Sequence, residues 1–115
     1  MRVLHRLRGK LGLWPFDPVP ETGPLLVEIY TALPARLAGM RKGISKIRDR
    51  DTLDAMLAAF GSAPHRPLPR YDDHATDAIL SAAWLRAAAN QPELWSPARL
   101  TPELARTEGW TFGVP

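Results

Sequence analysis

Apolar and polar positions separate the chain into helical segments, one apolar strand and several proline-rich loops. In residues 2–11, Val3 and the leucines recur at intervals of three and four, while arginine and lysine take the other faces. This pattern predicts a short amphipathic helix that ends at Gly12. Residues 14–24 contain four prolines and are expected to form a loop, which a very short strand could precede.

Residues 25–30, with the sequence Leu-Leu-Val-Glu-Ile-Tyr, are the one convincing strand. Five of these six residues are apolar, which predicts a strand covered on both faces. Thr31 is then placed to cap a short helix that runs through residues 35–38 and ends at Gly39. Near the end of the chain, residues 110–114 alternate and could form a final strand.

Two helices are predicted in the middle of the chain. The first begins with Asp51 as its cap and ends at Gly61. Its apolar residues follow the spacing i, i+3, i+4 and i+7, and are Leu53, Met56, Leu57 and Phe60. A loop with three prolines follows. Asp72 or Asp73 is then expected to cap the longest helix, over about residues 73–89.

A loop and a short helix are predicted between the long helix and the possible final strand. Pro92 and Pro97 predict another loop, after which residues 101–103, Thr-Pro-Glu, open a short helix with proline at its first position. Together, the elements predict a single α/β domain of 115 residues. We expect a small sheet of two or three strands and four or five helices.

The composition narrows the class of protein. Apolar residues make up 45% and charged residues 23%, which is ordinary for a globular domain. There is no cysteine, so disulfides and cysteine-based zinc sites are excluded, and a reducing, cytoplasmic location is expected. No apolar run approaches the roughly 18 residues that a membrane span needs, so no membrane partner is expected. Residues 1–13 lack the continuous apolar stretch of a secretory signal.

Charge is distributed unevenly along the chain. The net charge of +3 combines an excess of six positive charges in residues 1–50 with an excess of three negative charges in residues 51–115. A basic first half suits a polyanion such as nucleic acid, although a solvated arginine-rich surface would give the same pattern. Residues 40–50 form a basic connector between predicted elements. Its basic side chains are Arg41, Lys42, Lys46, Arg48 and Arg50, against the single acidic residue Asp49.

Glu28 is the first residue that could carry chemistry. It is a lone carboxylate within the apolar strand at residues 25–30. A buried, unpaired charge is unfavourable, so this carboxylate would need a partner, a proton or a metal ion. Alternatively, Glu28 reaches solvent at the end of the sheet. The strand pattern alone does not separate these two interpretations.

A second group of polar residues lies at the predicted start of the long helix, within Asp-Asp-His-Ala-Thr-Asp-Ala. Asp73 and Asp77 are four residues apart and His74 and Asp77 three apart, so all three project to one side of a helix. Two like charges at this spacing repel, and a divalent cation would reverse the sign of that interaction. Helix capping accounts for Asp73. It does not account for Asp77, which lies a full turn inside.

The order of these motifs resembles a family of predicted RNase H-like nucleases of unknown function. The resemblance rests on Trp-Pro-Phe-Asp at residues 14–17, Leu-Val-Glu-Ile-Tyr at 26–30, the basic connector, the Asp-Asp-His helix start and Glu-Gly-Trp at 108–110. It covers nearly the whole chain. The spacing His74, Asp77, Ala78 is similar to the last catalytic helix of RuvC-like nucleases. The chain therefore resembles the C-terminal half of such a domain.

This resemblance implies a metal-dependent phosphodiester hydrolase. By that likeness Glu28, Asp73 and Asp77 are metal ligands, and Glu28, Asp77 and His74 are the catalytic residues, with His74 positioning a water or accepting a proton. Hard oxygen ligands suit Mg²⁺ or Mn²⁺, and two such ions would activate a water and stabilise the leaving oxygen. Phosphates of the nucleic acid would be held by basic side chains of the connector, namely Arg41, Lys42, Lys46 and Arg48.

The chain departs from the family pattern at its start. An RNase H-like domain begins with a hairpin whose first strand supplies a central metal-binding aspartate. Nothing before Leu25 fits that strand, and Asp17 lies in a loop between prolines. We therefore expect a partial RNase H-like fold, inactive on its own unless another segment or chain supplies the missing strands. The exposed edge at residues 25–30 could also pair with a partner strand.

Three hypotheses follow: an incomplete nuclease, a non-catalytic nucleic-acid-binding module, and a protein-interaction module. The long helix is expected to pack on the strand at residues 25–30, which would bring Glu28 and Asp77 within reach of a shared cation. Neither His5 nor His65 is assigned a role as ligand or base. Glu108-Gly109-Trp110 is assigned to structure, with Gly109 allowing a turn.

Overall fold

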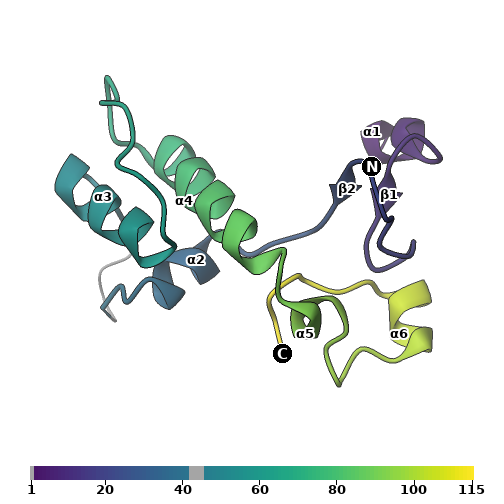
Figure 1. The fold of residues 1–115 in the computed structure, drawn as a ribbon. Helices are drawn as coiled ribbons and strands as arrows, with labels where there is room; N and C mark the ends of the chain where they lie inside the picture. Colours follow the sequence, from purple (N-terminus) through teal and green to yellow (C-terminus); the bar gives the residue numbers. More distant parts are fainter. Residues whose placement is uncertain (1, 42–45) are drawn as a thin grey trace. The chain divides into compact units, whose positions relative to one another are not determined.

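The computed structural model describes residues 2–41 and 46–115. The helices and strands follow in the order α1 (Arg2–Leu7), β1 (Gly12–Leu13), β2 (Leu25–Leu26), α2 (Ala32–Leu37), α3 (Arg50–Ala59), α4 (Asp73–Ala88), α5 (Pro92–Trp95) and α6 (Pro102–Thr107) (Figure 1). The chain divides into two units. The first combines residues up to Ile29 with Pro92–Pro115, and the second is Tyr30–Gln91.

A two-stranded parallel sheet lies in the first unit, where β1 pairs with β2 and Gly12 lies opposite Leu25 (Figure 1). The ladder continues for one more bond, from the N–H of Trp14 to the carbonyl of Leu26 at 3.0 Å. The ladder stops there because the chain turns at residues 14–16, where the Asp17 N–H donates to the Leu13 carbonyl at 2.8 Å. The sequence-based expectation of an α/β fold with a very small sheet is confirmed in this coarse form.

The strand predicted at residues 25–30 is shorter than expected. After β2, the pairing is reduced to an isolated parallel bridge between Glu28 and Thr111. The predicted final strand at residues 110–114 contributes only this bridge. The expectation that the strand is covered on both faces is wrong for Glu28 and Tyr30, which are both exposed.

The core of the first unit is an aromatic cluster of Trp14, Trp95 and Phe112. The Trp14 ring lies edge-on to both of the others, at centroid distances of 6.0 Å from Trp95 and 5.6 Å from Phe112. Trp14 Nε1 also donates to the Trp95 carbonyl at 3.3 Å. The last turn of α5 supplies Trp95, so the prediction of a loop around Pro92 is wrong. Proline is tolerated at the first position of a helix, where no N–H is needed.

The second unit is built from α2, α3 and α4, and both shorter helices pack on α4 (Figure 1). Its core consists of apolar side chains at helical spacing, and comprises Ala35, Ile47, Leu53, Met56, Leu57, Leu80 and Ala83. The predicted apolar face of α3 supplies three of these residues. A stop at Gly61 is confirmed by its φ of +65° and by the bond from the Ser62 N–H to the Leu57 carbonyl.

The cap of α3 differs from the sequence-based prediction. Asp49, not Asp51, is the cap, and its carboxylate accepts hydrogen bonds from the backbone N–H and the hydroxyl of Thr52, both at 2.8 Å. The cap therefore lies two residues before the predicted one, and the helix begins at Arg50. Both aspartates precede the same apolar run, and only Asp49 has a threonine three residues later to bond in this way.

The longest helix, α4, agrees with its prediction to within one residue at its end. Asp72 is the cap, and its carboxylate accepts from the Ala75 N–H at 3.0 Å. In the first unit, Thr101 caps α6 as expected and accepts from the Leu104 N–H at 3.2 Å. The described residues contain six helices, one more than the upper expectation, because α5 was predicted as loop. Across residues 2–41 and 46–115, none of the helices has the length and apolar character to cross a bilayer.

Candidate functional site

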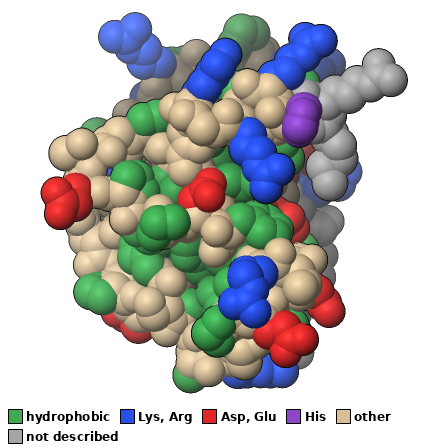
Figure 2. Space-filling model, turned by 90° about the vertical axis from the view of Figure 1, so that its right-hand side faces the viewer, with side chains coloured by type: hydrophobic (Ala, Val, Ile, Leu, Met, Phe, Trp, Pro, Cys, Tyr) green, Lys and Arg blue, Asp and Glu red, His purple; other side chains and the backbone are tan. Residues whose placement is uncertain are grey.

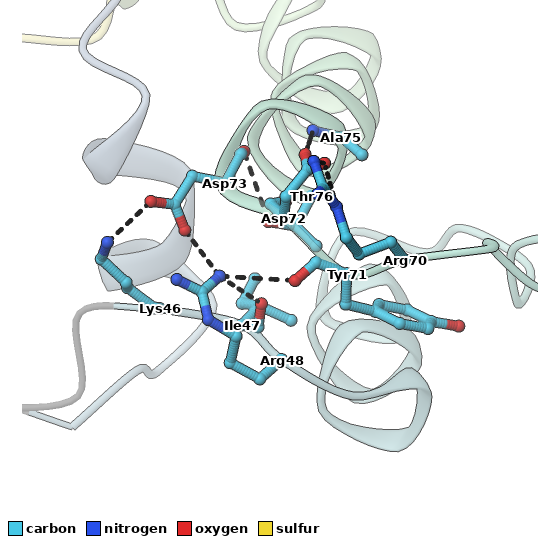
Figure 3. Close-up of polar contacts among 9 residues, drawn as sticks. All are labelled: Lys46, Ile47, Arg48, Arg70, Tyr71, Asp72, Asp73, Ala75 and Thr76. Atoms are coloured by element: carbon cyan, nitrogen blue, oxygen red, sulfur yellow. Dashed lines mark hydrogen bonds and ion pairs between the residues drawn. The ribbon is translucent and has the colours of Figure 1, made fainter.

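The start of α4 gathers charged side chains from three segments of the second unit (Figure 3). Its cap, Asp72, is also ion-paired with Arg70, whose Nη2 lies 2.8 Å and Nε 3.1 Å from Oδ2. The pKa of the Asp72 carboxyl is lowered, first by the hydrogen bond from the Ala75 N–H and then by Arg70. Asp72 is therefore held ionised as a structural cap.

Asp73 is paired with two cations of the basic connector. Lys46 Nζ lies 2.9 Å from its Oδ2 and Arg48 Nη1 lies 2.6 Å from its Oδ1. Hydrogen bonds from Lys46 and then Arg48 lower the pKa of Asp73 from 3.8 to about 2. All three side chains remain about half exposed, so the arrangement is open to solvent. The predicted metal ligand Asp73 thus already has cationic partners.

Arg48 forms hydrogen bonds that hold the basic connector against the start of α4. Its Nη1 lies 3.2 Å from the carbonyl oxygen of Ile47 and 3.5 Å from that of Tyr71, in addition to its bond to Asp73 (Figure 3). Ile47 itself is buried in the core of the second unit, with 3% of its surface exposed. The guanidinium is therefore oriented by a fixed backbone, which reduces the entropy lost when it binds an anion.

The other two predicted side chains of α4 differ from Asp73 in their surroundings. His74 is exposed and Asp77 is half-buried, and neither forms an ion pair within the part of the chain that the structure describes. Asp77 lies one turn after Asp73 on the helix, as the sequence predicts. The same helix therefore carries one neutralised and one unpaired carboxylate.

Glu28 has surroundings different from those expected for a buried ligand. Its side chain is exposed, and its Oε1 accepts a hydrogen bond from the Thr111 hydroxyl at 3.4 Å. It belongs to the first unit and Asp77 to the second, and each unit is defined by itself, so their expected proximity stays a prediction. Within residues 2–41 and 46–115, no group of three or more His, Asp or Glu side chains is arranged to hold a metal ion.

The predicted phosphate contacts are partly described. Arg41, Lys46 and Arg48 are exposed, as a polyanion interface requires, whereas Lys42 lies outside the described residues. Two positive charges face the single negative charge of Asp73. The local balance therefore stays positive, and the connector can still attract phosphate.

A hydrogen-bonded chain of Asp54, His65 and Tyr71 was not predicted from the sequence. The Asp54 carboxylate accepts from the His65 backbone N–H at 2.9 Å and lies 2.6 Å from its Nδ1, while Nε2 lies 2.9 Å from the Tyr71 hydroxyl. The His65 side chain is only 6% exposed. The backbone bond from His65 is the main cause of a lowered pKa for Asp54. The chain anchors the proline-rich loop to α3.

No sequence pattern predicts these hydrogen bonds. Asp54 lies on a helix, His65 in a loop and Tyr71 at the end of that loop, so no helical or strand spacing relates them. Tyr71 links these hydrogen bonds to the candidate site, since the carbonyl of Tyr71 lies near the guanidinium of Arg48.

Comparison of the sequence with protein-family models and with curated proteins, and of the structure with solved structures, gives no match. The likeness to RNase H-like nucleases therefore stays a resemblance of motifs.

Proposed function

We propose that this chain binds nucleic acid through the phosphate backbone, using the basic connector and the start of α4, and that it does not hydrolyse it unaided. The observation that carries this proposal is the pair of Lys46 and Arg48 on Asp73. A guanidinium held by backbone carbonyls, beside a lysine and next to a solvent-exposed helix start, suits bidentate binding of a phosphate. Such contacts position a nucleic acid without reading its sequence.

The state of the carboxylates supports binding rather than catalysis. Asp73 is neutralised by two cations at short distance. Glu28 is exposed to solvent, so its charge does not need a metal ion to compensate for burial. A phosphate arriving at Lys46 and Arg48 would compete with Asp73, which tunes affinity without any metal.

The second candidate is the nuclease that the motif resemblance implies, with a partial RNase H-like fold completed by another segment or chain. The observation in its favour is Asp77, which is half-buried, has no ion pair among the described residues and follows His74 on α4. Its carboxylate and that of Glu28 are hard oxygen ligands suited to Mg²⁺ or Mn²⁺. In that assembly His74 would position a water or accept its proton.

Binding to labelled oligonucleotides tests the first proposal. Fluorescence anisotropy should be measured with single- and double-stranded DNA and RNA of about 20 nucleotides. The affinity should fall as salt is added, and for single strands the logarithm of the binding constant should fall against the logarithm of the salt concentration with a slope of about −0.7 per phosphate contact. EDTA should leave the affinity unchanged.

The matched variants remove the same number of charges at two places. Lys46→Ala with Arg48→Ala should weaken binding and flatten the salt slope. The control, Arg66→Ala with Arg99→Ala, removes two exposed arginines outside the candidate site and should change the slope less. Equal effects of the two double variants would mean that binding depends on the net charge of the protein and not on the candidate site. Loss of binding in EDTA would favour the metal-dependent candidate.

A further inference from the structure

An apolar groove of about 580 Å³ opens on the first unit. Its apolar lining comes from α1, the residues before and within the sheet, and the following loop, and consists of Leu4, Leu7, Leu11, Leu13, Phe16 and Leu26. Leu4 is 37% and Phe16 49% exposed, so much of this surface faces solvent. Figure 2 shows hydrophobic side chains gathered on this side of the molecule, with Lys and Arg side chains around them and Asp or Glu side chains among them and at their edges.

The volume of the groove is typical of small-molecule sites, which span about 300–1,000 Å³. Six of its ten lining residues are leucine or phenylalanine, and the other four carry the polar side chains. The size and lining therefore favour a compact ligand with an apolar body.

The rim of the groove carries cations. Arg8 and Arg106 line it together with His5, and neither arginine forms an ion pair within residues 2–41 and 46–115. One carboxylate is present, that of Asp17, and it accepts a hydrogen bond from the Leu13 N–H at 2.9 Å. Two such guanidinium groups beside an apolar floor are complementary to an anionic head on an aliphatic tail.

We propose that this groove binds a free, monomeric aliphatic carboxylate, with its tail along the leucines and its head paired with Arg8 and Arg106. Burial of the tail supplies the apolar part of the affinity, in proportion to the area removed from water. The two arginines supply the selectivity for an anion over a neutral or cationic head of the same length. This inference concerns the first unit alone and does not depend on nucleic-acid binding by the second.

Three probes with the same tail isolate the contribution of the head: octanoate, octan-1-ol and octylamine, each below its micelle concentration. Titration followed by amide chemical shifts should place octanoate in the groove. Octanoate should bind about tenfold or more tightly than octanol, the effect expected of charge-assisted hydrogen bonds. Octylamine should bind most weakly. Equal binding of octanoate and octylamine would overturn the proposal, as would no binding of octanoate.

Variants separate the head contact from the tail contact. Arg8→Gln with Arg106→Gln should reduce octanoate binding to the level of octanol and leave octanol binding unchanged, while Arg99→Gln, outside the groove, should change neither. Leu4→Gln should weaken both ligands, and its already exposed position makes misfolding no obstacle. Octanoate binding that resists the double arginine substitution would exclude the proposed head contact. Shifts confined to α3 and α4 would place the ligand elsewhere and reject the groove.

Discussion

Arg48 Nη1 lies 2.6 Å from Oδ1 of Asp73, so a residue expected to contact phosphate neutralises a residue expected to bind metal. The two predictions drew on the same motif resemblance, and their residues are 25 positions apart in the chain. Their contact makes the two roles competitive, because a carboxylate shared with a guanidinium has fewer lone pairs for a cation. This competition gives the structure its most direct tests.

Asp73→Asn should increase the affinity for nucleic acid. The substitution keeps the shape of the side chain but removes the charge that engages Lys46 and Arg48. Both cations then become available to phosphate, and the salt slope for single strands should steepen by up to about 0.7 for each additional phosphate that is bound. Anisotropy titrations at several salt concentrations measure this change. A metal-ligand role for Asp73 predicts the opposite pattern, with unchanged or weaker binding that responds to Mg²⁺.

The ionisation of Asp73 should be visible by NMR. Its pKa should lie near about 2 and should rise toward 3.8 in the variant with Lys46→Ala and Arg48→Ala. Because the folded-state pKa is below the unfolded value, the ion pairs stabilise the fold fully above that unfolded value. This stabilisation is lost as the pH falls from about 4 to about 2. Urea unfolding of Asp73→Asn should lack this part of the pH dependence, and an unchanged profile would rule out the pairing in solution.

Metal binding distinguishes the two proposed functions. Calorimetric titration of the purified chain with Mg²⁺ and Mn²⁺, together with Glu28→Ala and Asp77→Ala, should show no site shared by the two carboxylates if the chain only binds nucleic acid. Binding that both substitutions abolish would instead establish a half-site assembled from the two units. That result would favour the metal-dependent nuclease. The next step would then be to look for the segment or chain that supplies the missing strands of its fold.

His65→Ala should destabilise the second unit. It removes the contacts of the ring with Asp54 and with the Tyr71 hydroxyl, while the Asp54 carboxylate keeps the backbone N–H of residue 65 and Arg50 at 3.5 Å. The loss of two hydrogen bonds should destabilise by about 1–3 kcal/mol. Tyr71→Phe removes one hydrogen bond only and should cost about 0.5–1.5 kcal/mol. Urea unfolding measures both. Equal, negligible effects would mean that the loop is held by its apolar contacts alone.

Gly109→Ala tests a close approach in the first unit. Gly109 has a φ of +79°, and a Cβ there would lie 3.1 Å from Cζ of Phe16. The left-handed backbone alone should cost about 1–2 kcal/mol. Gly23→Ala is the control, because Gly23 has a φ of +100° and a Cβ added there would meet no atom within 4 Å. Thermal unfolding should show the larger loss at Gly109, and equal losses would leave the Phe16 contact without effect.

The parts of the fold set by local sequence could be predicted. Asp72 and the long apolar pattern after it define α4, because capping and helical spacing act within a few residues. The extent of β2 could not be predicted, since the ladder ends where the chain turns after its partner strand, at residues 14–16. Asp49 and Asp51 both precede the apolar run of α3, and the bonds from Thr52 show that Asp49 is the cap.

The candidate site was predictable only in part, for a similar reason. Helical spacing identifies Asp73 and Asp77 as neighbours on one face. It does not identify Lys46 and Arg48 as partners of Asp73, because that contact depends on the fold of the connector. The chain through Asp54, His65 and Tyr71 was missed on the same ground.

The division of the chain also constrains how it folds during synthesis. The second unit is one continuous segment, Tyr30–Gln91, whereas the first is discontinuous and needs residues from both sides of it. The aromatic cluster of Trp14, Trp95 and Phe112 can form only after Phe112 has left the ribosome. The second unit can fold before that point. The helices α3 and α4 can therefore reach their native packing before Thr111 is available to pair with Glu28.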